Sequence, residues 1–149
     1  MNRLNRPLRW LMIAWLLCLT PWVQAAEDKP FAEKKVVLQI SDQDAYKQTL
    51  VLNVASNLVK HYGPDKVDVE IVAFGPGLRL LFADNSNAGR IDGLSSSSGV
   101  RFSACANTLS KVTKKLGSEP VLNSNATHVS AGVVRIIDLV DQGYTLVKP

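Results

Sequence analysis

The run VDVEIVAF at residues 67–74 is short, apolar and rich in β-branched side chains, and Gly75-Pro76-Gly77 follows it directly. An apolar run bounded by turn residues in this way predicts a buried strand. Four other segments share this character, the last of them more weakly: KVVLQIS at 35–41, VRFSA at 100–104, YTLVK at 144–148 and THVSA at 127–131. The chain is therefore expected to form five strands.

Amphipathic helices are predicted between these strands. In residues 44–62 apolar side chains recur every three or four positions, which places them on one face of a helix that ends at Gly63-Pro64. Residues 106–116 and 132–142 are further helix candidates. Each of the two is followed by a glycine, the residue that commonly ends a helix.

The alternation of strands and helices predicts one α/β domain over residues 35–149. Its sheet is expected to be mainly parallel, with five strands and with helices covering both sides. Residues 84–98 (DNSNAGRIDGLSSSS) offer only Ile91 and Leu94 as an apolar face, so a short helix and a mobile loop fit them equally well. The charged segment 26–34 (AEDKPFAEK) is expected to be a flexible lead-in.

Residues 1–25 have the three parts of a secretory signal peptide. A basic segment (MNRLNRPLR) precedes the apolar stretch WLMIAWLLCL, and Val23-Gln24-Ala25 forms a small-residue cleavage box. The apolar stretch is shorter than the about 20 residues that span a bilayer, so a transmembrane anchor is not expected. Cleavage is expected after Ala25, and no membrane anchor would then remain. The sequence thus predicts a periplasmic protein in an oxidising compartment.

The chain without its signal peptide is nearly neutral, because residues 26–149 contain 14 basic and 13 acidic side chains. Proteins that bind nucleic acids or anionic membranes through charge carry a clustered basic excess, so both classes are excluded. The same residues contain a single cysteine, Cys105, and no intramolecular disulfide is available.

Cys105 is the one strand-end residue that offers a nucleophile. It follows a strand and opens a helix, so the N–H groups of Ala106, Asn107 and Thr108 are expected to point toward its sulfur. A helix N-terminus stabilises a thiolate and lowers the pKa of the thiol. These features favour a reactive thiol that holds a persulfide or forms a mixed disulfide. A packed, unreactive cysteine is the alternative.

The other strand ends carry weaker signals. Gly75 and Gly77 would let the backbone approach a neighbour closely and expose amides to an anion, although a tight turn is the commoner meaning of such a segment. Asp42 and Asp44 could form a metal or phosphoryl-acceptor pair. Capping of the following helix by Ser41 or Asp44 is the commoner role.

Two histidines and two arginines are weaker candidates for a role near the thiol. His61 and His128 show no zinc-ligand spacing with Cys105, so neither a metal site nor a cofactor is expected, although His128 could be a proton partner of the sulfur. Arg79 could hold an anionic sulfur donor. For Arg79 and for Arg101 a solvated or structural role is the default.

The order and spacing of these segments resemble the DsrE/DsrF-like family, in particular its small exported branch. The resemblance is carried by the strand with its GPG turn, by the strand that runs into Cys105-Ala106-Asn107-Thr108, and by AGV…QGY…KP in residues 131–149. It covers nearly all of residues 35–149. The chain departs from the family in residues 84–98, where the family has a well-formed amphipathic helix.

The resemblance implies a Rossmann-like three-layer fold, assembly into homotrimers or homohexamers, and sulfur trafficking in which Cys105 carries persulfide sulfur. The first hypothesis is thus a periplasmic sulfur-transfer protein whose partners are a sulfane-sulfur donor and an acceptor thiol or protein. Cys105 would be the nucleophile. The candidate substrate-binding residues are Ala106, Asn107, Thr108, Gly75, Gly77 and Asp42. The alternative is a non-catalytic module for small-ligand binding or oligomeric assembly, with a structural cysteine.

Overall fold

The computed structural model describes residues 29–149, and the predicted signal peptide lies outside them. Strands and helices alternate along this part of the chain. The elements are β1 (Lys34–Ile40), α1 (Ala45–Tyr62), β2 (Val67–Ala73), the 3-10 helix η1 (Gly75–Leu81), α2 (Ala88–Ser98), β3 (Arg101–Cys105), α3 (Ala106–Leu116), β4 (Ala126–Val129), α4 (Gly132–Asp141) and β5 (Thr145–Val147).

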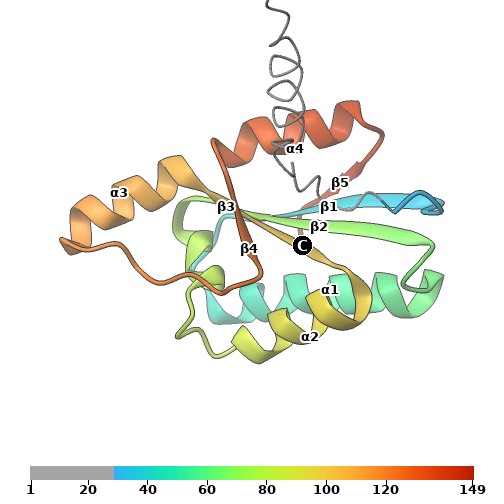
Figure 1. The fold of residues 1–149 in the computed structure, drawn as a ribbon, viewed down its shortest axis with the longest axis horizontal. Coiled ribbons are helices and arrows are strands. Elements are labelled where there is room, and N and C mark those ends of the chain that lie inside the picture. Colours follow the sequence, from blue (N-terminus) through green and yellow to red (C-terminus); the bar gives the residue numbers. More distant parts are fainter. Residues whose placement is uncertain (1–28) are drawn as a thin grey trace, which may run out of the picture.

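The five strands form one sheet in the order β4-β3-β2-β1-β5, and every neighbouring pair is parallel. From β1 to β4 the chain steps in one direction, and it then returns to place β5 on the other side of β1. Because parallel crossovers are right-handed, the return connection lies on the opposite face. Figure 1 shows α1 and α2 on one face of the sheet and α4 on the other. The predicted Rossmann-like three-layer α/β fold is confirmed.

Two apolar cores lie on the two faces of the sheet. The larger one packs alternate residues of the central strands, such as Ile71 and Phe102, against α1, α2 and η1. The smaller one, under α4, consists of Val37, Val72, Ile136, Leu139 and Tyr144. Side chains alternate between faces along a strand. Arg101, Ser103 and Cys105 of β3 therefore face α4, because Phe102 and Ala104 belong to the larger core.

The α4 face also buries charged side chains. Glu70, only 1% exposed, accepts hydrogen bonds from Ser103 Oγ at 2.6 Å and from Arg135 Nε and Nη2 at 2.7 Å each. Asp68 accepts from Arg101 Nη2 and from the Tyr144 hydroxyl. Burial raises the pKa of Glu70, but Arg135, Ser103 and Arg101 lower it more, so its pKa lies below the usual value. Arg135 thus attaches α4 to the centre of the sheet.

One segment differs from the expectation, and a second takes one of the two forms that the sequence left open. Gly75-Pro76-Gly77 is the first turn of η1 rather than an isolated tight turn. Residues 84–98, for which a helix and a loop fitted equally well, form α2 from Ala88 onward. Ile91 supplies the reason, because its side chain is fully buried and the partly buried Leu94 packs beside it.

Residues 29–34, the part of the expected lead-in that the structure describes, contact the rest of the domain at both of their ends. Lys29 Nζ donates hydrogen bonds to three carbonyl oxygens, those of Pro64, Val67 and Ser98, at 2.7, 3.2 and 2.5 Å. Lys34 already belongs to β1, one residue before the predicted start of this strand.

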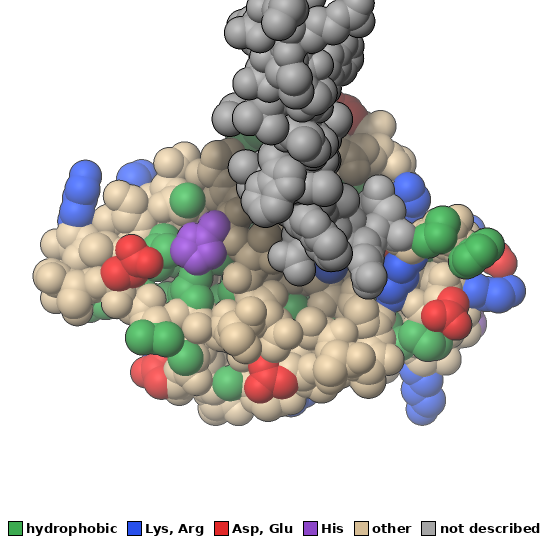
Figure 2. Space-filling view, viewed as in Figure 1, with side chains coloured by type: hydrophobic (Ala, Val, Ile, Leu, Met, Phe, Trp, Pro, Cys, Tyr) green, Lys and Arg blue, Asp and Glu red, His purple; other side chains and the backbone are tan. Residues whose placement is uncertain are grey.

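Charges of both signs are dispersed over the face drawn in Figure 2, where Lys and Arg side chains do not gather into one patch. No helix within residues 29–149 has the length and apolar character needed to cross a bilayer.

Candidate functional site

Cys105 is the last residue of β3 and the N-cap residue of α3. It is 5% exposed and lies at the carboxyl end of the sheet, on the side that faces α4. The backbone amide of Gly132, the first residue of α4, is one of the groups that lower the pKa of this thiol. The thiol therefore sits where the N-termini of two helices meet.

The groups around the sulfur favour its thiolate form. Burial raises the pKa of the Cys105 thiol, but the Thr108 hydroxyl and the backbone amides of Gly132, Thr108 and Asn107 lower it more. The net pKa is below the ordinary cysteine value. The sulfur makes no regular side-chain capping bond to α3, so the lowering is the sum of several polar contacts rather than one strong bond.

Thr108 connects the thiol to the glycine turn. Its hydroxyl oxygen accepts a hydrogen bond from the Gly75 amide at 2.9 Å, and the same hydroxyl lowers the pKa of the Cys105 thiol. Gly75 has φ +54°, in the left-handed region that side chains disfavour. A glycine at position 75 therefore allows the backbone conformation in which this amide points at Thr108.

Gly77 allows η1 to approach β1 at a distance that no side chain would permit. A Cβ atom at this position would lie 2.4 Å from the carbonyl oxygen of Ile40 and 2.8 Å from Cα of Ser41. Gly132 is similarly close to Phe74, whose Cβ would stand 2.9 Å from an added Cβ. These two contacts set the positions of η1 and α4 beside the thiol.

The structure brings together most of the predicted site. Ala106 begins α3 beside Cys105, and Asn107 contributes its backbone amide, which also donates to the Ser130 carbonyl oxygen at 3.3 Å. The Asn107 side chain is exposed.

Asp42 is not one of the groups that shift the pKa of the Cys105 thiol. It forms a surface ion pair with Lys47 at 3.0 Å. Asp44 caps α1 by accepting from the Lys47 amide at 2.9 Å, as the capping interpretation predicted.

The histidine and arginine candidates have other surroundings. The register pairs His128 with Ala104 and Val129 with Cys105, so alternation directs the His128 side chain to the face opposite the thiol. Arg101 pairs with Asp68 at 3.1 Å, which is a structural role. Within residues 29–149 no group of three or more His, Cys, Asp or Glu side chains is arranged to hold a metal ion.

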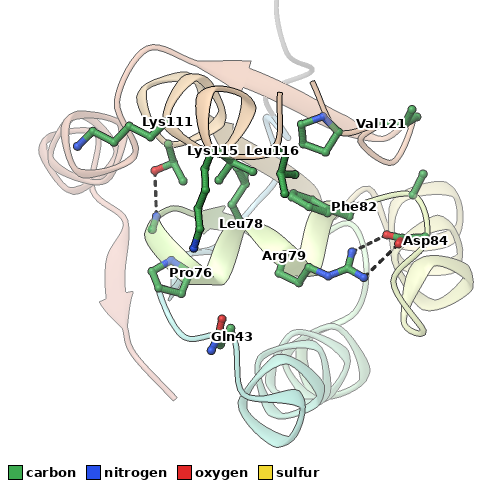
Figure 3. Close-up of a pocket in the computed structure, with 15 residues that line it drawn as sticks. Gln43, Pro76, Leu78, Arg79, Phe82, Asp84, Lys111, Lys115, Leu116 and Val121 are labelled. Atoms are coloured by element: carbon green, nitrogen blue, oxygen red, sulfur yellow. Dashed lines mark hydrogen bonds and ion pairs between the residues drawn. The ribbon is translucent and has the colours of Figure 1, made fainter. Parts of the chain in front are cut away.

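A groove of about 920 Å³ lies between η1 and α3, next to this site. Gly75 and Thr108 are part of its wall, and so the groove and the thiol share these two residues. Arg79 lines the groove as well, where it pairs with Asp84 and lies over the Phe82 ring (Figure 3). The remaining lining is mostly apolar: Pro76, Leu78, Ala83, Val112, Leu116, Pro120 and Val121, with Gln43, Lys111 and Lys115.

Sequence reasoning did not identify the groove or the part that Gly132 plays at the sulfur. Gly132 could be placed at the sheet edge because it follows the fourth strand. Its contact with Cys105 depends on the return of α4 over the opposite face, which local patterns do not encode.

The geometry can be compared with known proteins. No family model and no curated protein matches the sequence. The chain is similar to the solved structure of MTH1491, a protein of unknown function from Methanobacterium thermoautotrophicum. The two share 28% sequence identity and superpose with a TM-score of 0.69, over 78% of this chain and 100% of the other.

Proposed function

We propose that this protein is an exported carrier of sulfane sulfur that acts through Cys105. The observation that carries the proposal is the position of the thiol between two helix N-termini, where the Thr108 hydroxyl and nearby amides lower its pKa. The thiolate is the form of cysteine that attacks sulfur. The resemblance to DsrE/DsrF-like proteins and the signal-like residues 1–25 support the same function and a periplasmic location.

The proposed reaction transfers one sulfur atom in two displacements. The Cys105 thiolate attacks the outer sulfur of a donor persulfide, a new S–S bond forms, and the donor leaves as its thiolate. An acceptor thiolate then attacks the outer sulfur on Cys105, and the Cys105 thiolate is released. Each displacement exchanges one S–S bond for another, so the cycle consumes no external oxidant or reductant. The surrounding amides stabilise the anion on Cys105 at both stages.

Intact mass measurement tests the carrier function. The protein is incubated with polysulfide and desalted, and its intact mass is measured before and after treatment with a reductant. We expect a reversible increase of about 32 Da per sulfur atom that is absent from Cys105→Ala. Transfer is followed with a small acceptor thiol. Folded protein that takes up no sulfur, or a Cys105→Ser variant that loads and transfers as well as wild type, would show the proposal to be wrong.

A packed structural cysteine in a binding or assembly module is the competing function, and the low exposure of Cys105 favours it. Alkylation of the native protein separates the two. A carrier thiol reacts without denaturant, and its rate falls with acidification at a pH below the usual cysteine pKa. A structural cysteine reacts only after unfolding.

We also propose that copies of this chain associate through α4. Val133, Ile137 and Val140 follow one another at helical spacing and are 54%, 54% and 44% exposed. A contiguous apolar row of this kind is unusual on a monomer and typical of an interface. Light scattering after size exclusion should give an oligomer mass that Ile137→Lys reduces and Tyr46→Lys, on the exposed side of α1, leaves unchanged. A monomeric wild type refutes the association.

A further inference from the structure

The groove between η1 and α3 leaves large apolar side chains uncovered. Its floor includes Leu78, which is fully buried, whereas Leu116 and Val121 on its rim are 58% and 77% exposed. Its volume of about 920 Å³ lies within the range of small-molecule sites, about 300–1,000 Å³. The groove thus offers an apolar surface large enough for an organic molecule.

Two lysines line the groove, Lys111 and Lys115, and neither forms an ion pair within residues 29–149. Arg79 is matched by Asp84, with 3.1 Å between Nη2 and Oδ2. Figure 3 shows the Lys115 side chain extending into the groove toward Pro76, whereas Lys111, one turn earlier on α3, points away from it.

We propose that this groove binds a small amphipathic carboxylate, with its apolar chain against Leu78, Phe82 and Leu116 and its anionic group at the Lys115 ammonium. The pairing of the Lys115 ammonium, which extends into the groove, with an apolar wall selects this chemistry. A neutral hydrocarbon would leave Lys115 unused, and a small polyanion would leave the apolar wall exposed to water. The binding site is distinct from the thiol, although Gly75 and Thr108 border both.

Decanoate, titrated into the protein without its signal peptide, tests the proposal by calorimetry and by amide chemical shifts in NMR spectra. We expect saturable binding with shifts concentrated at η1 and α3. Decanol has the same chain without the charge, and it should bind about tenfold more weakly. Lys115→Ala should weaken decanoate binding by a similar factor and leave decanol binding unchanged.

The control variant is Lys114→Ala, which removes the same charge from the neighbouring residue of α3 outside the groove. It should change decanoate affinity less than twofold, about what a screened surface charge contributes. Cys105→Ser should bind decanoate as well as wild type, so the result does not depend on sulfur transfer. Equal affinities for decanoate and decanol, equal effects of the two lysine variants, or shifts confined to α4 would overturn the proposal.

Discussion

The buried ion pair between Arg135 and Glu70 joins α4 to the sheet, so breaking it should lower the free energy of unfolding by a predictable amount. In Arg135→Met the methionine retains most of the apolar stem but leaves the Glu70 carboxylate without its two 2.7 Å hydrogen bonds. Removing one partner of a buried pair typically costs about 3–5 kcal/mol. Ser103 at 2.6 Å and Arg101 at 3.4 Å remain beside the carboxylate. We therefore expect the lower end, about 3 kcal/mol.

Urea unfolding followed by circular dichroism measures this loss. With a slope of about 2 kcal/mol per molar urea, the midpoint should fall by about 1.5 M. The control Lys66→Met breaks an exposed ion pair with Glu33, and it should cost less than about 1 kcal/mol. A double variant, Glu70→Met with Arg135→Met, should regain most of the stability, since buried pairs are often replaceable by apolar side chains. A single-variant loss below about 1 kcal/mol would refute the reasoning.

Three further predictions concern the turn, the thiol and the buried carboxylate. Gly77→Ala should lower the free energy of unfolding by about 1–3 kcal/mol, because the added Cβ would overlap backbone atoms. Gly89→Ala places its Cβ in open space and should not destabilise the protein, and thermal unfolding compares the two variants. Thr108→Val should raise the pKa of the Cys105 thiol by removing a hydroxyl group, so the pH profile of alkylation should move to higher pH. Thr108→Ser should restore the original profile, and an unchanged profile in Thr108→Val contradicts this role. Because the folded-state pKa of Glu70 is lowered, its stabilisation is present above its unfolded pKa near 4.5 and is lost as the pH falls through the folded value. Urea midpoints measured from pH 6 downward should show this loss, and a Glu70→Gln protein should not.

The fold could be predicted from the sequence because its signals are local. The apolar runs at β1 and β2, the helical spacing in α1, and the glycines after α3 and α4 each depend on residues within one segment. The alternation of these segments leaves few topologies for a parallel sheet. Even β4, the weakest of the predicted strands, appears at the sheet edge.

The prediction of the site was less complete, for a physical reason. Cys105 and Thr108 belong to one strand-to-helix junction, so their proximity follows from the chain itself. The contribution of Gly132 depends on α4 crossing to the other face, and the η1 groove depends on packing between separate elements. The charged residues of β2 gave a signal that went unused: Asp68 and Glu70 interrupt an otherwise apolar run and require buried cationic partners.

The buried charges and the thiol are linked through α4. A charged residue inside a sheet costs desolvation, so Glu70 is tolerated only where Arg135 reaches it from the helix. That requirement adds a directional constraint on the rotation and the height of α4 over the sheet to the non-directional apolar contacts of Ile136 and Leu139. Fixing the first turns of α4 also fixes the Gly132 amide at the Cys105 sulfur, three residues before Arg135. The ion pair therefore positions a donor for the thiolate while contributing little net stability compared with an apolar pair.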